Sequence, residues 1–354
     1  MTRHTDQVFD EYRNLLFSVA YRILGSAADA EDAVQDAWVK WSAADRSQVT
    51  DPKAYLVRIV SNVAMDRLRS AQARRETYVG PWLPEPILTS TDTADDATAA
   101  ESVSVALLVV LEALSPLERA VFVLKEAFGF SYAEIADAVE RSEDTVRQAA
   151  ARARRNVQAR RPRFHADRAR QRQVTERFFA AAGGGDINTL MQLLAPDVTL
   201  WTDGGGKVRQ AMHPVVGAER VAAWFAAIGT RSYQGIEPGD MGVEVIELNG
   251  GAGIVCYEMT AREQRGEHSE RGADRARNRA IQPSTAGRVI ATLTLDLDDA
   301  GRIVTIHNVA NPDKLHAVAS RTTLHIGPDH RPAARATGSE VNGVDGVDEV
   351  DGVD

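Results

Sequence analysis

The chain has little cysteine and no long apolar run, and both shortages limit what it can be. Of its 354 residues only Cys256 is a cysteine, which excludes an internal disulfide framework and a zinc site built from several cysteines. No apolar run approaches the ~20 residues of a membrane-spanning helix, and the first residues are polar. These features predict a cytoplasmic protein in a reducing compartment, with Cys256 buried in a strand.

A net charge of −9 would by itself argue against a protein that binds nucleic acid. The charge is unevenly distributed, however. Eleven arginines and three acidic residues lie between Arg141 and Arg172, whereas the segment from Ser339 to Asp354 has six acidic residues and no lysine or arginine. Because DNA responds to local charge rather than to the average over a chain, the sequence predicts a basic DNA-binding segment and a separate acidic tail.

The pattern of apolar and polar residues divides the chain into two helical segments, a linker between them, and an α+β region. Helical segments are predicted at 6–72 and 102–161, with the linker at 73–101. The α+β region is predicted at 168–318, followed by a low-complexity tail at 319–354. Within that region we expect helices at 170–182, 186–194 and 218–228, strands at 198–201, 243–248, 254–259, 289–297 and 303–309, and an exposed charged loop at 262–288.

The most specific local signal lies between residues 115 and 160. Capping boxes that begin at Ser115 and Ser131 start two helices, and Ser142 caps a third. The second and third helices, joined by a short break, form a helix-turn-helix, whose last helix enters the major groove of DNA. The alternative is a solvated basic helix on an ordinary helical domain, but three capped helices at this spacing favour DNA binding. The predicted contacts to bases and phosphates are Thr145, Arg147, Gln148, Arg152 and Arg155.

Two amphipathic helices are predicted in the N-terminal segment. The run from Asp29 to Trp41 has one apolar face and an acidic stripe that suits a basic partner surface. A second helix begins at Asp51 and Pro52, with the aspartate as its cap. Each helix taken by itself is more typical of an ordinary surface than of a binding site.

Taken together, three runs resemble the extracytoplasmic-function (group 4) sigma factors of bacterial transcription. They are DAEDAVQDAWVKW at 29–41, AYLVRIVSNVAMDRLRS at 54–70 and LSPLERAVFVLKEAFGFSYAEIADAVERSEDTVRQAAARARRNV at 114–157. The resemblance implies that the first run binds the coiled coil of the largest subunit of RNA polymerase core, through Asp32, Gln35, Asp36 and Trp38. It implies that the second run reads the −10 element as single-stranded promoter DNA, through Arg58, Asn62, Arg67 and Arg69. The helix-turn-helix would read the −35 element as duplex.

Three short strings resemble the markers of a sigma subfamily that has a fused SnoaL-like domain and includes SigJ-type factors. They are WLPEP in the linker, DGGGK in the α+β region and NPDKL at its end. The resemblance implies a SnoaL-like, NTF2-type cone that regulates the sigma modules in cis, without a separate anti-sigma factor. The glycines could receive the linker or form an ordinary hairpin turn. The predicted regulatory contacts are Trp82, Leu83, Pro84, Glu85, Pro86, Asp203, Gly204, Gly205, Gly206, Lys207, Asn311, Pro312, Asp313, Lys314 and Leu315.

Two other functions stay open at this level. A ligand-responsive helix-turn-helix regulator would bind duplex DNA without polymerase, but it leaves the N-terminal helices unexplained. A SnoaL-type enzyme with a residual sigma half would use Asp203, His213 or His307 to move a proton, although nothing in the sequence pairs these residues. We expect no enzyme activity, metal or cofactor, and the cone could hold a small apolar ligand. The predicted fold class is multidomain: two all-α sigma modules followed by an α+β cone.

Overall fold

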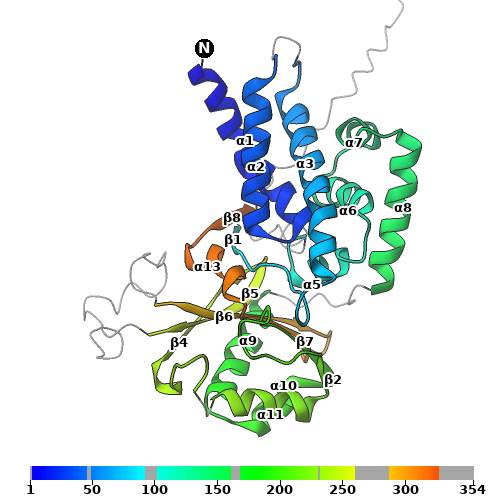
Figure 1. The fold of residues 1–354 in the computed structure, drawn as a ribbon. Coiled ribbons are helices and arrows are strands. Elements are labelled where there is room, and N and C mark those ends of the chain that lie inside the picture. Colours follow the sequence, from blue (N-terminus) through cyan, green and yellow to red (C-terminus); the bar gives the residue numbers. More distant parts are fainter. Residues whose placement is uncertain are drawn as a thin grey trace, which may run out of the picture.

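The arrangement of the chain is known from a computed structural model that describes residues 2–45, 49–91, 102–160, 168–229, 232–259 and 287–326. Helical modules lie on one side of a mixed β-sheet, and α9 (Arg168–Gly183), α10 (Ile187–Leu193) and α11 (Ala218–Gly229) lie on the other side (Figure 1). The predicted fold class, helical modules followed by an α+β domain, is confirmed. We call residues 168–326 the cone unit.

The N-terminal module consists of α1 (Thr2–Leu24), α2 (Ala27–Ala43) and α3 (Pro52–Arg75). Its helix ends follow local capping rules. The Ser26 side chain accepts a hydrogen bond from the backbone N–H of Asp29 at the start of α2, and Asp51 caps α3 by accepting from the backbone N–H of Ala54 at 3.0 Å. The cap at Asp51 and the helix start at Pro52 were both predicted from the sequence.

The helix-turn-helix module consists of α5 (Val105–Leu111), α6 (Pro116–Phe122), the π-helical turn η2 (Val123–Ala127), α7 (Tyr132–Val139) and α8 (Glu143–Arg160). Both predicted capping boxes are present, at Ser115 and Ser131. Glu140 ends α7 in the left-handed conformation, with φ of 54°, and this residue makes the turn into α8.

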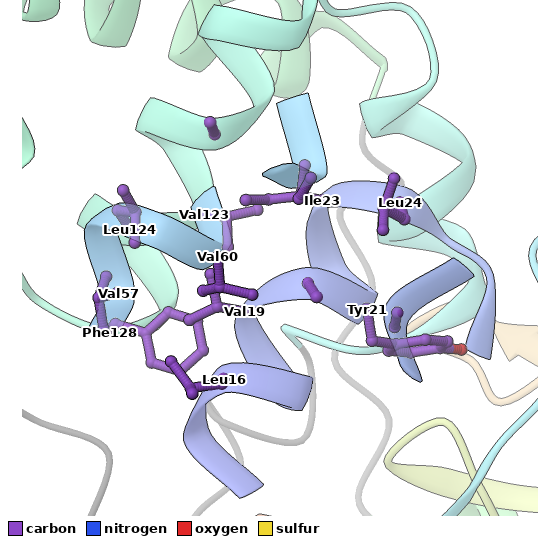
Figure 2. Packing of buried hydrophobic residues seen from close by; sticks show 14 of the residues in the cluster. Leu16, Val19, Tyr21, Ile23, Leu24, Val57, Val60, Val123, Leu124 and Phe128 are labelled. Carbon is purple, nitrogen blue, oxygen red and sulfur yellow. The ribbon is translucent and has the colours of Figure 1, made fainter. Parts of the chain in front are cut away.

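One apolar core joins the two helical modules. Figure 2 shows side chains of α1, α3 and η2 packed against one another, among them Leu16, Val60 and Leu124. The same buried cluster continues into α7 and α8. The amphipathic patterns predict that each helix buries one face, but they do not reveal that the modules share a core. The two modules are therefore packed as one body in this conformation.

The sheet has the order β3-β2-β7-β6-β5-β4-β1-β8. Strand pairs β2–β7 and β1–β8 are parallel, and the other pairs are antiparallel. The strands are β1 (Leu88–Thr91), β2 (Leu194–Asp203), β3 (Val215–Val216), β4 (Met241–Leu248), β5 (Gly251–Glu258), β6 (Val289–Leu297), β7 (Ile303–Val309) and β8 (Thr323–Ile326). Short helical turns are η3 (Pro238–Asp240), η4 (Pro312–Lys314) and α13 (His316–Ala319). The predicted helices and strands of this region are present, with bounds that differ by a few residues.

The two faces of the sheet have different roles. Leu293 and Leu295 of β6 and Ile306 of β7 belong to the core of the cone, under the helices. Val309 of β7 belongs instead to a small apolar cluster with Leu83 of the linker. Because side chains alternate along a strand, β7 contacts the cone interior with one set of residues and the linker with the other.

Two segments differ from the sequence prediction. The linker contributes strand β1 to the sheet, and the expected tail begins with ordered structure, because β8 continues the fold to Ile326. Leu324 and Ile326 are buried in the core of the helical modules. These short strands form through partners far away in the sequence, so their own residues give little signal. Residues 327–354 of the expected tail and 262–286 of the expected loop lie outside the described residues.

Replacing Leu324 by alanine is expected to lower the free energy of unfolding by about 2–5 kcal/mol, because this side chain is fully buried in the helical core. Urea denaturation followed by circular dichroism measures the change. Ile187→Ala is the control, since Ile187 is 47% exposed on α10; this variant should lose less than about 1 kcal/mol. Equal losses in the two variants would contradict the docking of β8 on the helical modules.

Candidate nucleic-acid interface and linker site

The side chains predicted to read the −35 element lie along one exposed side of α8. Val146 and Ala149 are buried and hold the helix against its module. Gln148 and Arg155 are exposed. The remaining predicted contacts have surface partners: the Thr145 hydroxyl lies 2.8 Å from that of Ser142, Arg147 pairs with Glu143, and Arg152 pairs with Glu118 at 2.7 Å. The Arg147–Glu143 pair is exposed and worth little, whereas the Glu118 side chain is 13% exposed and also accepts a hydrogen bond from the Ser115 hydroxyl.

The side chains predicted to read the −10 element are turned toward other parts of the protein. The Arg58 guanidinium lies 2.9 Å from the carboxylate of Glu140 in the helix-turn-helix, and the Asn62 amide donates to the carbonyl oxygen of Ala138 at 3.1 Å. Both partners end α7, in the other helical module. The structure therefore does not gather the predicted −10 contacts on one free surface.

The other two predicted −10 contacts pair with acidic side chains of the N-terminal module. Arg67 forms ion pairs with Asp36 at 2.6 Å and with Asp32 at 3.2 Å, and Arg69 pairs with Asp66. Arg67 thus joins a predicted DNA-contact surface to the acidic stripe of α2, which is the predicted polymerase contact. Those acidic groups also raise the pKa of the Arg67 guanidinium, first through its hydrogen bond with Asp36.

The predicted polymerase contacts lie on α2 beside a surface groove. Asp32 and Gln35 are exposed, and Asp36 is half-buried. Trp38 packs edge-on against Phe9 of α1, with ring centroids 5.0 Å apart. The groove has a volume of about 440 Å³, and its lining residues are Phe9, Asp10, Arg13, Glu31, Val34, Gln35 and Trp38. An aromatic edge flanked by acidic and amide groups suits a mixed, partly basic protein surface.

The carboxylate of Asp203, at the end of β2, is fully buried and joins three of the predicted regulatory strings. Its Oδ2 accepts from the backbone N–H of Leu83 at 2.8 Å and from the ammonium of Lys314 at 2.7 Å. Its Oδ1 accepts from the Tyr78 hydroxyl at 2.6 Å and from the Gly205 N–H at 3.1 Å. The linker, the glycine turn and the closing string therefore meet at one charged group. We call Tyr78, Leu83, Asp203 and Lys314 the linker site.

Lys314 completes the linker site from the closing string. Its ammonium also donates to the carbonyl oxygen of Leu83 at 2.6 Å and lies 4.1 Å from the centroid of the Trp82 ring. The Arg75 guanidinium of α3 lies over the same ring at 3.6 Å. Burial lowers the pKa of Lys314 to about 8, and the charge of Asp203 opposes this shift. The lysine is thus mostly charged at neutral pH because it has this partner.

The glycine turn allows the close approach between the strings. Gly205 and Gly206 have φ of 59° and 71°, in the left-handed region. A Cβ on Gly205 would lie 2.3 Å from the amide nitrogen of Asn311, and a Cβ on Gly206 would lie 3.1 Å from Val79 of the linker. The turn is therefore a receiving surface and not only a hairpin connection. Among the remaining predicted contacts, Lys207 and Asp313 form an exposed ion pair, and Pro312 is exposed. Gly204, Pro84 and Pro86 are buried, and Leu315 packs with Leu83.

Glu85 of the linker caps the helix that carries the predicted polymerase contacts. Its carboxylate accepts from the backbone N–H groups of Ala27 at 2.8 Å and Ala28 at 3.2 Å, and from the Ser26 hydroxyl at 2.8 Å. An acidic side chain at a helix N-terminus is favourable, although burial raises the pKa of Glu85. The linker string is thereby fixed to the start of α2.

Asn249 is a second junction that the sequence does not predict. Its amide donates to the Tyr21 hydroxyl of α1 at 2.7 Å and to the carbonyl oxygen of Val103 at 2.9 Å. Its Oδ1 accepts from the backbone N–H of Ile87 at 3.1 Å. The Asn-Gly dipeptide at this position indicates a hairpin turn, but nothing local shows that the turn contacts both helical modules and the linker. Tyr78 was missed for the same reason.

The three residues considered for an enzyme lie in different environments. Both oxygens of Asp203 are occupied at the linker site, and His213 is exposed. His307 lies 3.7 Å from Asp296, and burial lowers its pKa to about 4, so its ring is uncharged near neutral pH. Within the described ranges no set of three or more His, Cys, Asp or Glu side chains is placed to hold a metal ion. None of the helices described is long and apolar enough to span a membrane.

Comparison with known proteins identifies relatives of the chain. The family Sigma-70 region 2 matches residues 8–74, and the family Sigma-70, region 4 matches residues 104–157. The chain is 37% identical over 311 residues to the ECF RNA polymerase sigma factor SigJ of Mycobacterium tuberculosis, with 86% of this chain and 91% of that protein covered. It is 36% identical over 213 residues to the probable ECF RNA polymerase sigma factor SigI of the same species, with 59% and 72% covered. The crystal structure of SigJ superposes with a TM-score of 0.63 at 33% identity, covering 87% of this chain and 97% of that one.

Asp203→Asn is expected to lower the free energy of unfolding by about 3–5 kcal/mol, because it leaves the buried Lys314 ammonium without an ionic partner. Asp313→Asn is the matched control: it makes the same chemical change in the same pair of strings, but its ion pair with Lys207 is exposed, so the loss should stay below about 1 kcal/mol. Urea denaturation monitored by tryptophan fluorescence measures both. A loss in Asp203→Asn no larger than in the control would rule out a structural role for the buried pair.

Proposed function

The chain belongs to the extracytoplasmic-function sigma factors, and on this premise we propose that its cone unit holds the two sigma modules in a closed arrangement that cannot read a promoter. As a sigma factor the chain directs transcription initiation by RNA polymerase and is not an enzyme. A repressor-type regulator would need no polymerase-binding module, whereas here Sigma-70 region 2 matches the N-terminal helices. The proposal concerns how this activity is controlled.

In the open arrangement, α3 would read the −10 element through Arg58, Asn62, Arg67 and Arg69, while α8 would read the −35 element. The −10 and −35 elements are about 25 base pairs apart. Along B-DNA this spacing corresponds to roughly 80 Å. The closed arrangement has α3 in contact with α7 of the other module. Both elements cannot be engaged while the modules are packed together, so promoter binding requires them to separate.

The observation that carries the proposal is the pairing of predicted −10 contacts with the helix-turn-helix module. Arg58 is held by Glu140, and Asn62 by Ala138. A promoter strand would have to displace these partners. RNA polymerase would favour the open form if it binds the acidic stripe of α2 and the apolar surface that separation exposes, because a partner shifts an equilibrium by its difference in affinity for the two states.

The cone unit would supply the restraint in place of a separate anti-sigma factor. Asp203 and Lys314 fix the linker, and Asn249 contacts α1, the linker and the start of the helix-turn-helix module. A restraining domain on the same chain acts at a high effective concentration, so weak contacts suffice.

Since the partner is RNA polymerase core, the proposed place of action is the cytoplasm. We further propose that a small molecule in the cone modulates this restraint.

Run-off transcription with purified RNA polymerase core and the DNA upstream of the chain's own gene tests the proposal. Asp203→Asn should give at least about 5-fold more promoter-specific transcript than the unaltered chain, because weakening the linker site shifts the population toward the open form. Asp197→Asn, at an exposed position of the same strand, is the control and should behave like the unaltered chain. Equal or lower output from Asp203→Asn would refute restraint by the cone unit.

Glu140→Asn is expected to tighten promoter binding by the polymerase complex about 2- to 5-fold. The change removes the acidic partner of Arg58, and asparagine tolerates the left-handed backbone at this position. Glu126→Gln is the control, because Glu126 pairs with Arg154 within the helix-turn-helix module. Affinities should be measured at one fixed salt concentration. Equal gains in both variants would attribute the effect to net charge rather than to release of Arg58.

A further inference from the structure

The cone unit contains an apolar cavity on the face of the sheet that does not contact the linker. Its volume is about 190 Å³. It lies between α9, α11 and the strands, and its walls are largely aromatic and aliphatic, including Phe178, Phe179, Trp224, Phe225 and Cys256. No charged side chain of the described residues lines it. A charged ligand would therefore lose its hydration without gaining an ionic partner.

One polar amide lies in this apolar wall. Asn308 of β7 is 3% exposed and lines the cavity. Its Oδ1 is buried and has no hydrogen-bond partner in the part of the chain that the structure describes. Buried polar atoms are nearly always paired, so this oxygen is available to accept a hydrogen bond from a ligand. A ligand group that donates a hydrogen bond would satisfy it.

Cavity size and wall chemistry together define the ligand class. A cavity of about 150 Å³ lined by aliphatic and aromatic side chains holds one benzene ring, so a slightly larger one fits a single ring with one or two small substituents. We propose that this cavity binds an uncharged single-ring molecule whose one hydroxyl group donates to the Oδ1 of Asn308, and that occupancy is coupled to the linker site. The coupling rests on the proposed restraint by the cone unit; the binding does not.

Two connections lead from the cavity to the linker site. Along β7, Asn308 is followed by Val309, which is paired with Asp203 across the strands and packs with Leu83 of the linker. The second connection runs through Tyr233 in the cavity wall, whose hydroxyl accepts a hydrogen bond from the Gln210 amide. Gln210 lies against Gly204, where a Cβ would come within 2.8 Å of its Cγ. A ligand that shifts β7 or Tyr233 thus acts on residues adjacent to Asp203.

Isothermal titration calorimetry of the full chain with two probes, p-cresol and toluene, tests the binding. The probes share the ring and the methyl group and differ only in the hydroxyl. We expect p-cresol to bind about 3- to 10-fold more tightly than toluene, the difference that one hydrogen bond makes. Asn308→Leu, which keeps the approximate size of the side chain, should abolish this preference and retain toluene binding. No binding of either probe, or equal binding of both by the unaltered chain, overturns the proposal.

A second variant guards against misfolding of the first. Ala291→Leu fills the cavity from β6, so it should abolish binding of both probes while the thermal midpoint stays equal or rises.

Coupling is tested by reciprocity, since two linked sites change each other's affinity by the same factor. Asp203→Asn should change the Kd of p-cresol at least about 3-fold, and Asp197→Asn should leave it unchanged. An unchanged Kd in Asp203→Asn overturns the coupling, whereas failure of the proposed restraint would show in transcription without any probe.

Discussion

The hydrogen bonds and the ion pair of the buried Asp203 carboxylate hold the linker, the glycine turn and the closing string together. The carboxylate is bonded to the linker through Leu83 and Tyr78 and to the closing string through Lys314. A charge pair without solvent is stable only when both partners and their remaining hydrogen bonds are in place. The site therefore forms completely or not at all, and the position of the linker is set with it. Because Glu85 of the same linker caps α2, the linker is also fixed to the helix that carries the predicted polymerase contacts.

In this structure, residues predicted to read promoter DNA contact the other sigma module. The predicted −10 contacts Arg58 and Asn62 are held by the end of α7, and the modules share an apolar core. Each polar contact is individually weak, which suits the reversible closure proposed above. The stronger, buried interactions lie at the linker site, away from the residues predicted to read DNA. The proposed restraint and the predicted DNA contacts thus involve different residues.

In the cone unit, the apolar cavity and the contact with the linker lie on opposite faces of the same sheet. Strand β7 has Asn308 in the cavity and Val309 against Leu83. The alternation of side chains in a strand places neighbouring residues on opposite faces, so consecutive residues of β7 reach the two environments. Close-packed interiors transmit small displacements. The cavity and the contact with the linker are therefore adjacent along β7.

Local sequence determined the helices, their caps and most strands, because capping boxes such as that at Ser115 and alternating apolar runs act over a few residues. Resemblance to known sigma factors identified the strings WLPEP, DGGGK and NPDKL, and the structure brings all three to Asp203. Tyr78, Asn249, β1 and β8 could not be predicted, since their partners lie far away in the sequence: Asn249 bonds to Tyr21, and β8 pairs with β1. Only the tertiary structure decided which surfaces are covered, because burial and the pairing of charges depend on contacts between distant segments.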